Sequence, residues 1–125
     1  MEIMNGIDII EVDRIKESID EYGDAFLNRV YTQQEQKYCN ESEKMKYQRY
    51  AARFAAKEAI YKAISKNIEN TEDLSWNKIE ILNDEKGKPF ANLERLKLKE
   101  IKSMDLSISH IEKYAVASFS IIFDE

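Results

Sequence analysis

Hydrophobic and polar residues follow two different periods along this chain. In residues 3–12, Ile7, Ile9, Ile10 and Val12 surround Asp8, which predicts a short and mostly buried strand. A period of two returns at 76–83, 106–111 and 114–123, and helical spacing occupies 13–22, 25–30 and 40–66. This order predicts an α+β domain in which a long central helix packs on a mostly antiparallel sheet.

Local signals predict where several of these elements begin and end. Gly23 follows the first helical segment in the position of a C-terminal capping glycine. Thr32 and Glu35 have the spacing of a capping box, which predicts a further short helix before Asn40. Residues 84–87 are typical of a hairpin turn.

The long helical segment is the most informative part of the chain. It contains no Gly or Pro from Asn40 to about Lys66, and Asn40 with Glu43 predicts its start. At about 100° per residue, its small side chains form one narrow stripe, which consists of Ala52, Ala56, Ala59 and Ala63. This stripe predicts close packing against another element.

One carboxylate in this helix needs a partner. Glu58 and Lys62 share a strip of the helix surface with Ala51 and Ala55. Ionising a carboxylate among alanines costs several kcal/mol unless a cation or strong donors compensate the charge. Glu58 is therefore a candidate functional residue.

Composition and charge narrow the class of protein. The 125 residues are 43% hydrophobic, which predicts one domain over residues 1–125. A net charge of −5 argues against a general binder of nucleic acids or anionic membranes. A single Cys39 and a single His110 allow neither an internal disulfide nor a Cys/His metal site. Without a leader or membrane-spanning pattern, the sequence predicts a cytoplasmic protein.

Four short motifs together point to a family. They are Asn5-Gly6-Ile7-Asp8-Ile9, Arg53 to Ala59, Gly87-Lys88-Pro89 and Ser107-Ile108-Ser109-His110. In their order and spacing they resemble the holo-acyl-carrier-protein synthases, the small bacterial 4′-phosphopantetheinyl transferase family. The resemblance covers nearly the whole chain. It implies a homotrimer with active sites between neighbouring subunits, coenzyme A as donor, Mg²⁺ as metal and acyl carrier protein as acceptor, in fatty acid biosynthesis.

The two carboxylates suit the implied chemistry. Transfer of phosphopantetheine is attack on a pyrophosphate phosphorus, which a protein promotes by positioning and charge stabilisation. A Mg²⁺ ion bridging such oxygens needs one or two protein carboxylates. Asp8 and Glu58 are predicted to be its ligands, and they meet if their strand and helix pack together. The alternatives are a helix or turn acceptor for Asp8 and an ordinary pair with Lys62 for Glu58.

Several basic residues are candidates for the anionic donor. Cations near a pyrophosphate and a 3′-phosphate clamp their charge, and the candidates are Arg53, Lys57, Lys62 and Lys88. Gly87 allows the backbone to approach the ligand closely. By resemblance, Lys57 and Lys62 face the phosphates and the Gly87-Lys88-Pro89 turn faces the nucleotide end. For each lysine, the alternative is a solvated charge.

Ser109 and His110 do not form a nucleophile–base pair. Adjacent strand residues point to opposite faces of a sheet, so the two side chains cannot meet. The resemblance instead implies that both lie near the coenzyme A site, and a packed histidine is the alternative for His110. Cys39 is interpreted as a small half-buried side chain.

The carrier-docking surface departs from what the family resemblance leads one to expect. Relatives meet acidic carrier proteins with a basic first helix, whereas residues 11–21 here hold five acidic residues against Arg14 and Lys16. Arg14 matches the family's key basic position, and Arg29 and Phe26 are further candidates on the second helix. Electrostatic steering of the carrier is predicted to be weaker than in more basic relatives.

The sequence thus predicts a Mg²⁺-dependent transferase that converts apo-acyl carrier protein to its holo form. Asp8, Glu58 and Lys62 are its predicted catalytic residues, and either a metal-activated water or Glu58 takes the serine proton. Two other classes of protein remain open. One is a non-catalytic coenzyme A or nucleotide-binding subunit, and the other is an oligomerisation module.

Overall fold

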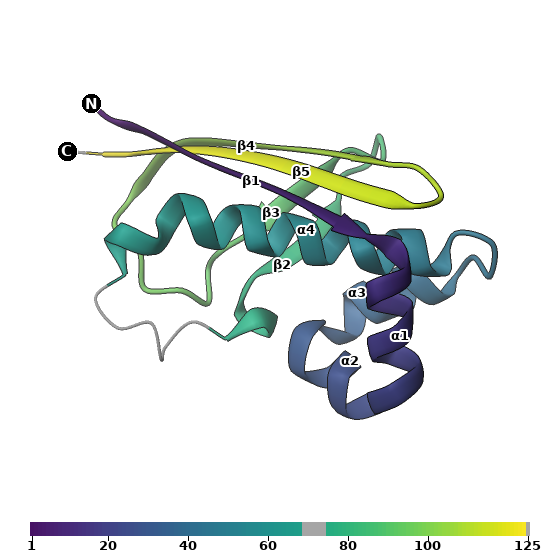
Figure 1. Ribbon diagram of the computed structural model, residues 1–125. Helices are drawn as coiled ribbons and strands as arrows, with labels where there is room; N and C mark the ends of the chain where they lie inside the picture. The colour runs from purple at the N-terminus through teal and green to yellow at the C-terminus, as the bar shows by residue number, and fades with distance from the viewer. Residues whose placement is uncertain (69–74, 125) are drawn as a thin grey trace.

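A three-stranded antiparallel sheet lies across one long helix in the computed structural model, which describes residues 1–68 and 75–124 (Figure 1). The sheet has the order β1-β5-β4, and its strands are β1 (Ile3–Glu11), β4 (Ile101–His110) and β5 (Tyr114–Phe123). Helix α4 (Lys46–Ile64) packs against one face of it. A separate hairpin consists of β2 (Glu80–Asn83) and β3 (Pro89–Asn92). The predicted α+β class, with a long helix on an antiparallel sheet, is confirmed.

Three short helices precede α4. They are α1 (Val12–Tyr22), α2 (Asp24–Val30) and α3 (Gln33–Asn40). Of these, α1 and α3 pack against α4, and α2 packs mainly against α1. The capping box at Thr32 is present with both of its hydrogen bonds, and the Gly23 N–H caps α1 by donating to Ile19 O. No helix in residues 1–68 and 75–124 is both long enough and apolar enough to cross a membrane.

The predicted start of the long helix at Asn40 is wrong. Asn40 is the last residue of α3, and α4 begins only at Lys46. The side chain of Asn40 accepts a hydrogen bond from the Tyr50 hydroxyl at 2.9 Å. Ser42 Oγ accepts the Met45 N–H at 3.1 Å, so a serine rather than Asn40 satisfies a backbone donor just before the helix.

The strand predicted over residues 76–83 is shorter than expected. Trp76–Lys78 form a 3₁₀ turn, and β2 covers only Glu80–Asn83. The carbonyl of Trp76 accepts the Ile79 N–H at 3.3 Å and also a hydrogen bond from Lys57 Nζ at 3.1 Å. A buried donor from another element thus competes with strand pairing at this point.

Strand β1 crosses α4 at unusually short range. A Cβ atom added to Gly6 would lie 1.8 Å from the carbonyl oxygen of Ala59. The alanine stripe therefore packs against the backbone of β1, as its small side chains predict. This contact brings the helix side of β1, where Gly6 and Asp8 alternate, directly over α4.

The opposite face of β1 is exposed in the single chain. Ile3, Ile7 and Ile9 are 68%, 60% and 67% exposed. The prediction of a mostly buried strand is therefore wrong for this face, because no element of residues 1–68 and 75–124 covers it. Tyr114 on β5 is also exposed, and it pairs with Glu11 at the end of β1.

The crossing makes Gly6→Ala a severe substitution. The added methyl group overlaps the Ala59 carbonyl, so strand and helix must separate, and overpacking of this kind costs about 3 kcal/mol of unfolding free energy. Gly87→Ala is the matched control because a Cβ there meets nothing within 4 Å and only the φ of 82° opposes it. Its cost is about 1 kcal/mol. Urea denaturation measures both, and equal costs would contradict the crossing.

Candidate active site

Two carboxylates and a lysine meet where β1 crosses α4. Lys62 Nζ donates to Asp8 Oδ1 at 3.2 Å and to the Ile7 carbonyl at 3.0 Å. Asp8 is half-buried, and its side chain is 17% exposed. Glu58 lies one helical turn before Lys62 on the same strip of α4 and is also half-buried. Strand and helix thus bring Asp8, Glu58 and Lys62 together.

The electrostatics of Glu58 reflect this crowding. Burial raises the pKa of Glu58, the charge of Asp8 raises it further, and the charge of Lys62 opposes both effects. The carboxylate is therefore poorly compensated in the chain alone. A further cation between Asp8 and Glu58 would stabilise the charged forms of both carboxylates.

A second cluster lies at the end of β4. The guanidinium groups of Arg49 and Arg53 stack on the ring of Tyr38, at 4.2 and 4.1 Å from its centroid. His110 Nδ1 lies 2.8 Å from Gln48 Oε1. Burial lowers the pKa of His110, and the charges of Arg49 and Arg53 lower it further, which favours the neutral ring.

Arg53 in this cluster retains an unused donor. The residue is 4% exposed, and within residues 1–68 and 75–124 its Nε is the one buried side-chain nitrogen or oxygen without a hydrogen-bond partner. Buried donors of this kind are costly and rare in folded proteins. Ser109 is exposed on the other face of β4 from His110, as the strand alternation predicts.

The β2–β3 turn adds one more cation. Asp84 Oδ1 accepts the backbone N–H groups of Lys86 and Lys88, and Gly87 takes a positive φ of 82°. Lys88 Nζ pairs with Asp105 on β4 at 2.9 Å, and both side chains are exposed. Since exposed pairs are worth little, an anionic ligand could compete for Lys88. Pro89 is half-buried at the start of β3.

The predicted site residues therefore fall on two flanks of α4. Asp8, Glu58 and Lys62 form the acidic flank, beside β1. Arg53 and His110 lie near each other at the end of β4, Ser109 lies on the other face of that strand, and the Gly87-Lys88-Pro89 turn reaches β4 at Asp105; we call these residues together the cationic flank. Arg53 and Glu58 are five residues apart, hence about 140° apart around the helix. Strand β5 separates β1 from β4 in the sheet (Figure 1).

Lys57 belongs to neither flank. Its ammonium is fully buried and donates to Glu35 Oε1 at 2.6 Å, to Val30 O at 2.6 Å and to Trp76 O at 3.1 Å. Burial lowers its pKa, which the charge and hydrogen bond of Glu35 oppose. The expectation that Lys57 meets the phosphates does not fit this geometry.

The candidate docking residues lie on the first two helices. Arg14 and Arg29 are exposed, on α1 and at the end of α2. Phe26 is half-buried, edge-on to Tyr31 with ring centroids 6.1 Å apart. Cys39 is fully buried, and burial, partly offset by Arg53, raises its pKa to about 12. It is therefore an inert core residue.

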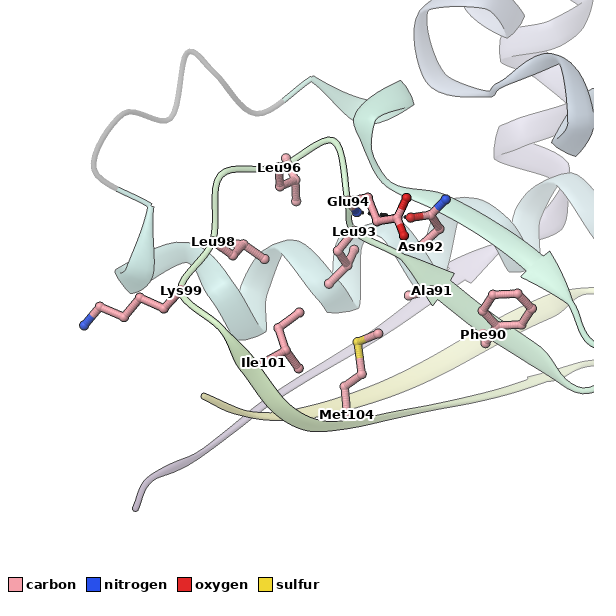
Figure 2. Close-up of a pocket in the computed structure, with 10 residues that line it drawn as sticks. All are labelled: Phe90, Ala91, Asn92, Leu93, Glu94, Leu96, Leu98, Lys99, Ile101 and Met104. Carbon is pink, nitrogen blue, oxygen red and sulfur yellow. Dashed lines mark hydrogen bonds between the residues drawn. The ribbon is translucent and has the colours of Figure 1, made fainter. Parts of the chain in front are cut away.

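An apolar pocket of about 490 Å³ lies elsewhere (Figure 2). It lies between β3, the segment that follows it and the start of β4, and Leu93, Leu98 and Ile101 point into it. None of the predicted site residues lines it. The pocket therefore does not mark the acidic or the cationic flank.

Sequence reasoning missed several residues of these clusters. Gln48, Arg49 and Tyr38 stand around His110 and Arg53, but their spacing alone gives no sign of it. In the sequence, Glu35 is identifiable only as the second half of a capping box. Its buried contact with Lys57 spans 22 positions in sequence, and periodicity does not register such a separation.

Comparison with known proteins shows the family. A family model described as ACPS, 4′-phosphopantetheinyl transferase superfamily, matches residues 4–118. The chain therefore belongs to this superfamily. Its curated relatives include the holo-[acyl-carrier-protein] synthase of Ruminiclostridium cellulolyticum, which is 45% identical over 94% of this chain and 90% of the relative. The synthase of Protochlamydia amoebophila is 46% identical over 90% and 91%.

Solved structures agree in fold. The holo-(acyl-carrier-protein) synthase of Bacillus anthracis, in complex with CoA (3′,5′-ADP), superposes with a TM-score of 0.79 at 34% identity, over 97% of this chain and 96% of that chain. The Helicobacter pylori enzyme, in complex with coenzyme A, has a TM-score of 0.81 at 31% identity, over 95% and 100%.

The crowding of Glu58 predicts how stability depends on pH. Its folded pKa lies above the ordinary value of 4.5, so the folded state holds this proton more tightly than the unfolded chain. Stability is therefore lost as pH rises from about that value through the raised pKa, and the loss persists at pH 7. In the presence of a metal chelator, the Glu58→Gln protein should melt at a higher temperature than the parent at pH 7. This difference in melting temperature should disappear near pH 4.

The exposed Glu94→Gln is the matched control for charge removal and should leave the melting temperature nearly unchanged. Calorimetry at several pH values measures the difference. A Glu58→Gln protein that melts lower than the parent at pH 7 would show that Glu58 is well compensated in the chain.

Proposed function

We propose that this chain transfers the 4′-phosphopantetheine group of coenzyme A to a serine of apo-acyl carrier protein, which yields holo-carrier and adenosine 3′,5′-bisphosphate. The observation that carries the proposal is the meeting of Asp8, Glu58 and Lys62 on the acidic flank. Membership of the superfamily and the names of the relatives support the same reaction. We place it in fatty acid biosynthesis, in the cytoplasm.

The acidic flank fits a Mg²⁺ ion. Two oxygen-donor carboxylates that repel each other are a suitable set for this hard cation, which usually keeps several waters. Within residues 1–68 and 75–124 there is no group of three or more candidate ligands, so the chain would contribute only Asp8 and Glu58. A bound Mg²⁺ would supply charge stabilisation to the pyrophosphate oxygens.

Lys62 has a separate role in this proposal. Its ammonium lies beside Asp8 and its side chain is half exposed, so it could turn toward a phosphate once a bound Mg²⁺ compensates the two acids. A cation here offsets the charge that develops on the oxygens of the phosphoryl group during transfer. Asp8 and Glu58 hold the site, and Lys62 faces the reacting phosphorus.

We propose further that each active site is shared between two copies in a homotrimer. The cationic flank would bind the 3′-phosphate and the nucleotide of coenzyme A through Arg53, Ser109, His110 and the Gly87-Lys88-Pro89 turn. Because β5 and α4 separate this flank from Asp8 and Glu58 in one chain, a compact ligand is best served by flanks of two adjacent chains.

The uncovered face of the sheet supports this assembly. Its exposed isoleucines, Ile3, Ile7 and Ile9, form an apolar row along the edge strand, which Asn5 interrupts between Ile3 and Ile7. Monomers seldom leave large apolar surface in water. Packing of three such faces would bury the row, and it would also place β1 of one chain near a neighbouring subunit.

Carrier docking is assigned to α1 and α2. Arg14 and Arg29 are exposed cations on these helices, and Phe26 on α2 offers a half-buried apolar side chain. Arg14 follows closely after β1, which carries Asp8, so it stands near the edge of the acidic flank. The five acidic residues of 11–21 weaken the attraction for an acidic carrier.

The decisive experiment is mass spectrometry of apo-carrier incubated with the chain, coenzyme A and Mg²⁺. We expect the carrier to gain one phosphopantetheine and Glu58→Gln to lower the rate about 10²-fold or more, because it removes a charge that the metal requires. Glu94→Gln should retain full activity. Calorimetric binding of coenzyme A without any carrier modification would favour the rival, a non-catalytic coenzyme A-binding subunit.

A complementation experiment tests the shared site. The acidic-flank variant Asp8→Asn and the cationic-flank variant His110→Ala/Lys88→Glu should each be nearly inactive. Co-refolded in equal amounts, they should recover activity, because random mixing leaves about a quarter of shared sites intact on both sides. A mixture of Asp8→Asn with Glu58→Gln, both on one flank, should recover none. Equal failure of both mixtures would place the whole site in one chain.

A further inference from the structure

A saturated ion pair lies at the junction of four elements. Lys57 on α4 and Glu35 on α3 are 2.6 Å apart, and both side chains are completely buried. An ammonium has three N–H donors. Here they have the acceptors Glu35 Oε1, Val30 O and Trp76 O, so no donor is left for a ligand.

Glu35 also uses nearly all of its acceptor positions on internal partners. Its Oε1 also accepts the Thr32 N–H at 2.9 Å, and its Oε2 accepts the Ile81 N–H at 2.9 Å. One carboxylate therefore joins the start of α3, the middle of α4 and strand β2. A buried charge is tolerable only with such complete pairing.

The pair also connects the two functional surfaces of the proposed enzyme. Val30, whose carbonyl Lys57 holds, is the last residue of α2 and follows Arg29 directly. On the other side, Lys57 is the neighbour of Glu58 in α4. Arg29 and Glu58 are thus linked through one hydrogen bond, which Lys57 Nζ donates to the Val30 carbonyl at 2.6 Å.

We propose that Lys57 and Glu35 are positioning residues, which hold α2 against α4 so that a carrier docked on Arg29 and Phe26 presents its serine to Asp8 and Glu58. The proposal rests on the transfer reaction and the docking surface proposed above. It assigns Lys57 to the carrier half of the reaction. A phosphate-binding lysine would instead act on coenzyme A.

The main variant removes both charges at once. Lys57→Met alone strands a buried carboxylate and is expected to unfold at lower temperature. In Lys57→Met/Glu35→Gln no charge remains, and the amide oxygen of the introduced glutamine side chain can still accept a backbone N–H. Two reference variants define the possible outcomes: Lys62→Met removes a cation of the acidic flank, and Arg29→Ala removes a docking cation.

The test requires the dissociation constant of coenzyme A from calorimetry and that of apo-carrier from fluorescence anisotropy, together with both KM values. In the double variant, coenzyme A should bind within about twofold of the parent, while the carrier constant should rise about tenfold, as in Arg29→Ala. Lys62→Met should show the reverse split. These binding measurements do not require catalysis. They therefore test the role of Lys57 even if the parent protein is inactive, a result that would refute only the proposed transfer reaction.

Two results would overturn the proposal. A loss of coenzyme A affinity like that of Lys62→Met, with carrier binding intact, would make Lys57 a phosphate ligand. Unchanged constants for both partners in a folded double variant would leave the pair with a purely structural role.

Amine labelling of the parent protein tests the saturated geometry without any substitution. Lys57 should resist reductive methylation with or without coenzyme A, because its ammonium is buried and fully bonded. Lys62 should react in the free protein and be protected by coenzyme A. Labelling of Lys57 that coenzyme A suppresses would contradict the proposal.

Discussion

The close crossing of β1 over α4 at Gly6 and Ala59 is the constraint on which the rest of the structure depends. No side chain separates the strand from the helix there, because an added Cβ would lie 1.8 Å from the Ala59 carbonyl. Asp8 is two positions beyond Gly6, and Glu58 precedes Ala59, so the same contact that closes the core also brings two carboxylates together. Small residues on the helix and a glycine on the strand thus determine the spacing of the acidic flank, and the chemistry of the site follows from backbone packing.

The charged residues of α4 show how pairing separates structural from functional roles. Lys57 and Glu35 use every donor and nearly every acceptor on internal partners, and such a pair has nothing left to offer a ligand. Glu58 is different, since burial and the charge of Asp8 both raise its pKa, and Lys62 compensates it only in part. Arg53 keeps a buried Nε without a partner among the described residues. Adjacent positions in one motif therefore differ in how fully their charges are paired, and we propose ligand-binding roles only for those that are incompletely paired.

Periodicity and capping patterns predicted most of the elements, because these signals are local. The capping box at Thr32 and the strand at 114–123 were placed correctly, and the alanine stripe correctly predicted close packing. The errors have non-local causes. Tyr50 engages Asn40 and Lys57 engages Trp76, so a distant partner decided each local outcome. Helical spacing shows that Lys57 and Lys62 lie on different sides of α4. It does not show which lysine pairs with Glu35, because that depends on tertiary packing.

The proposed assembly would account both for the exposed isoleucines on β1 and for the separation of the acidic and cationic flanks in one chain. A strand with isoleucines on one face and Gly6 and Asp8 on the other resembles a buried strand in sequence, yet a single chain covers only the second face. The isoleucines that led to the prediction of a mostly buried strand form the surface that another copy would cover. In the proposed trimer, burying this face would bring a neighbour to the edge strand that carries Asp8. A single interface would then cover the apolar face and also bring the cationic flank of a second chain toward the acidic flank of the first.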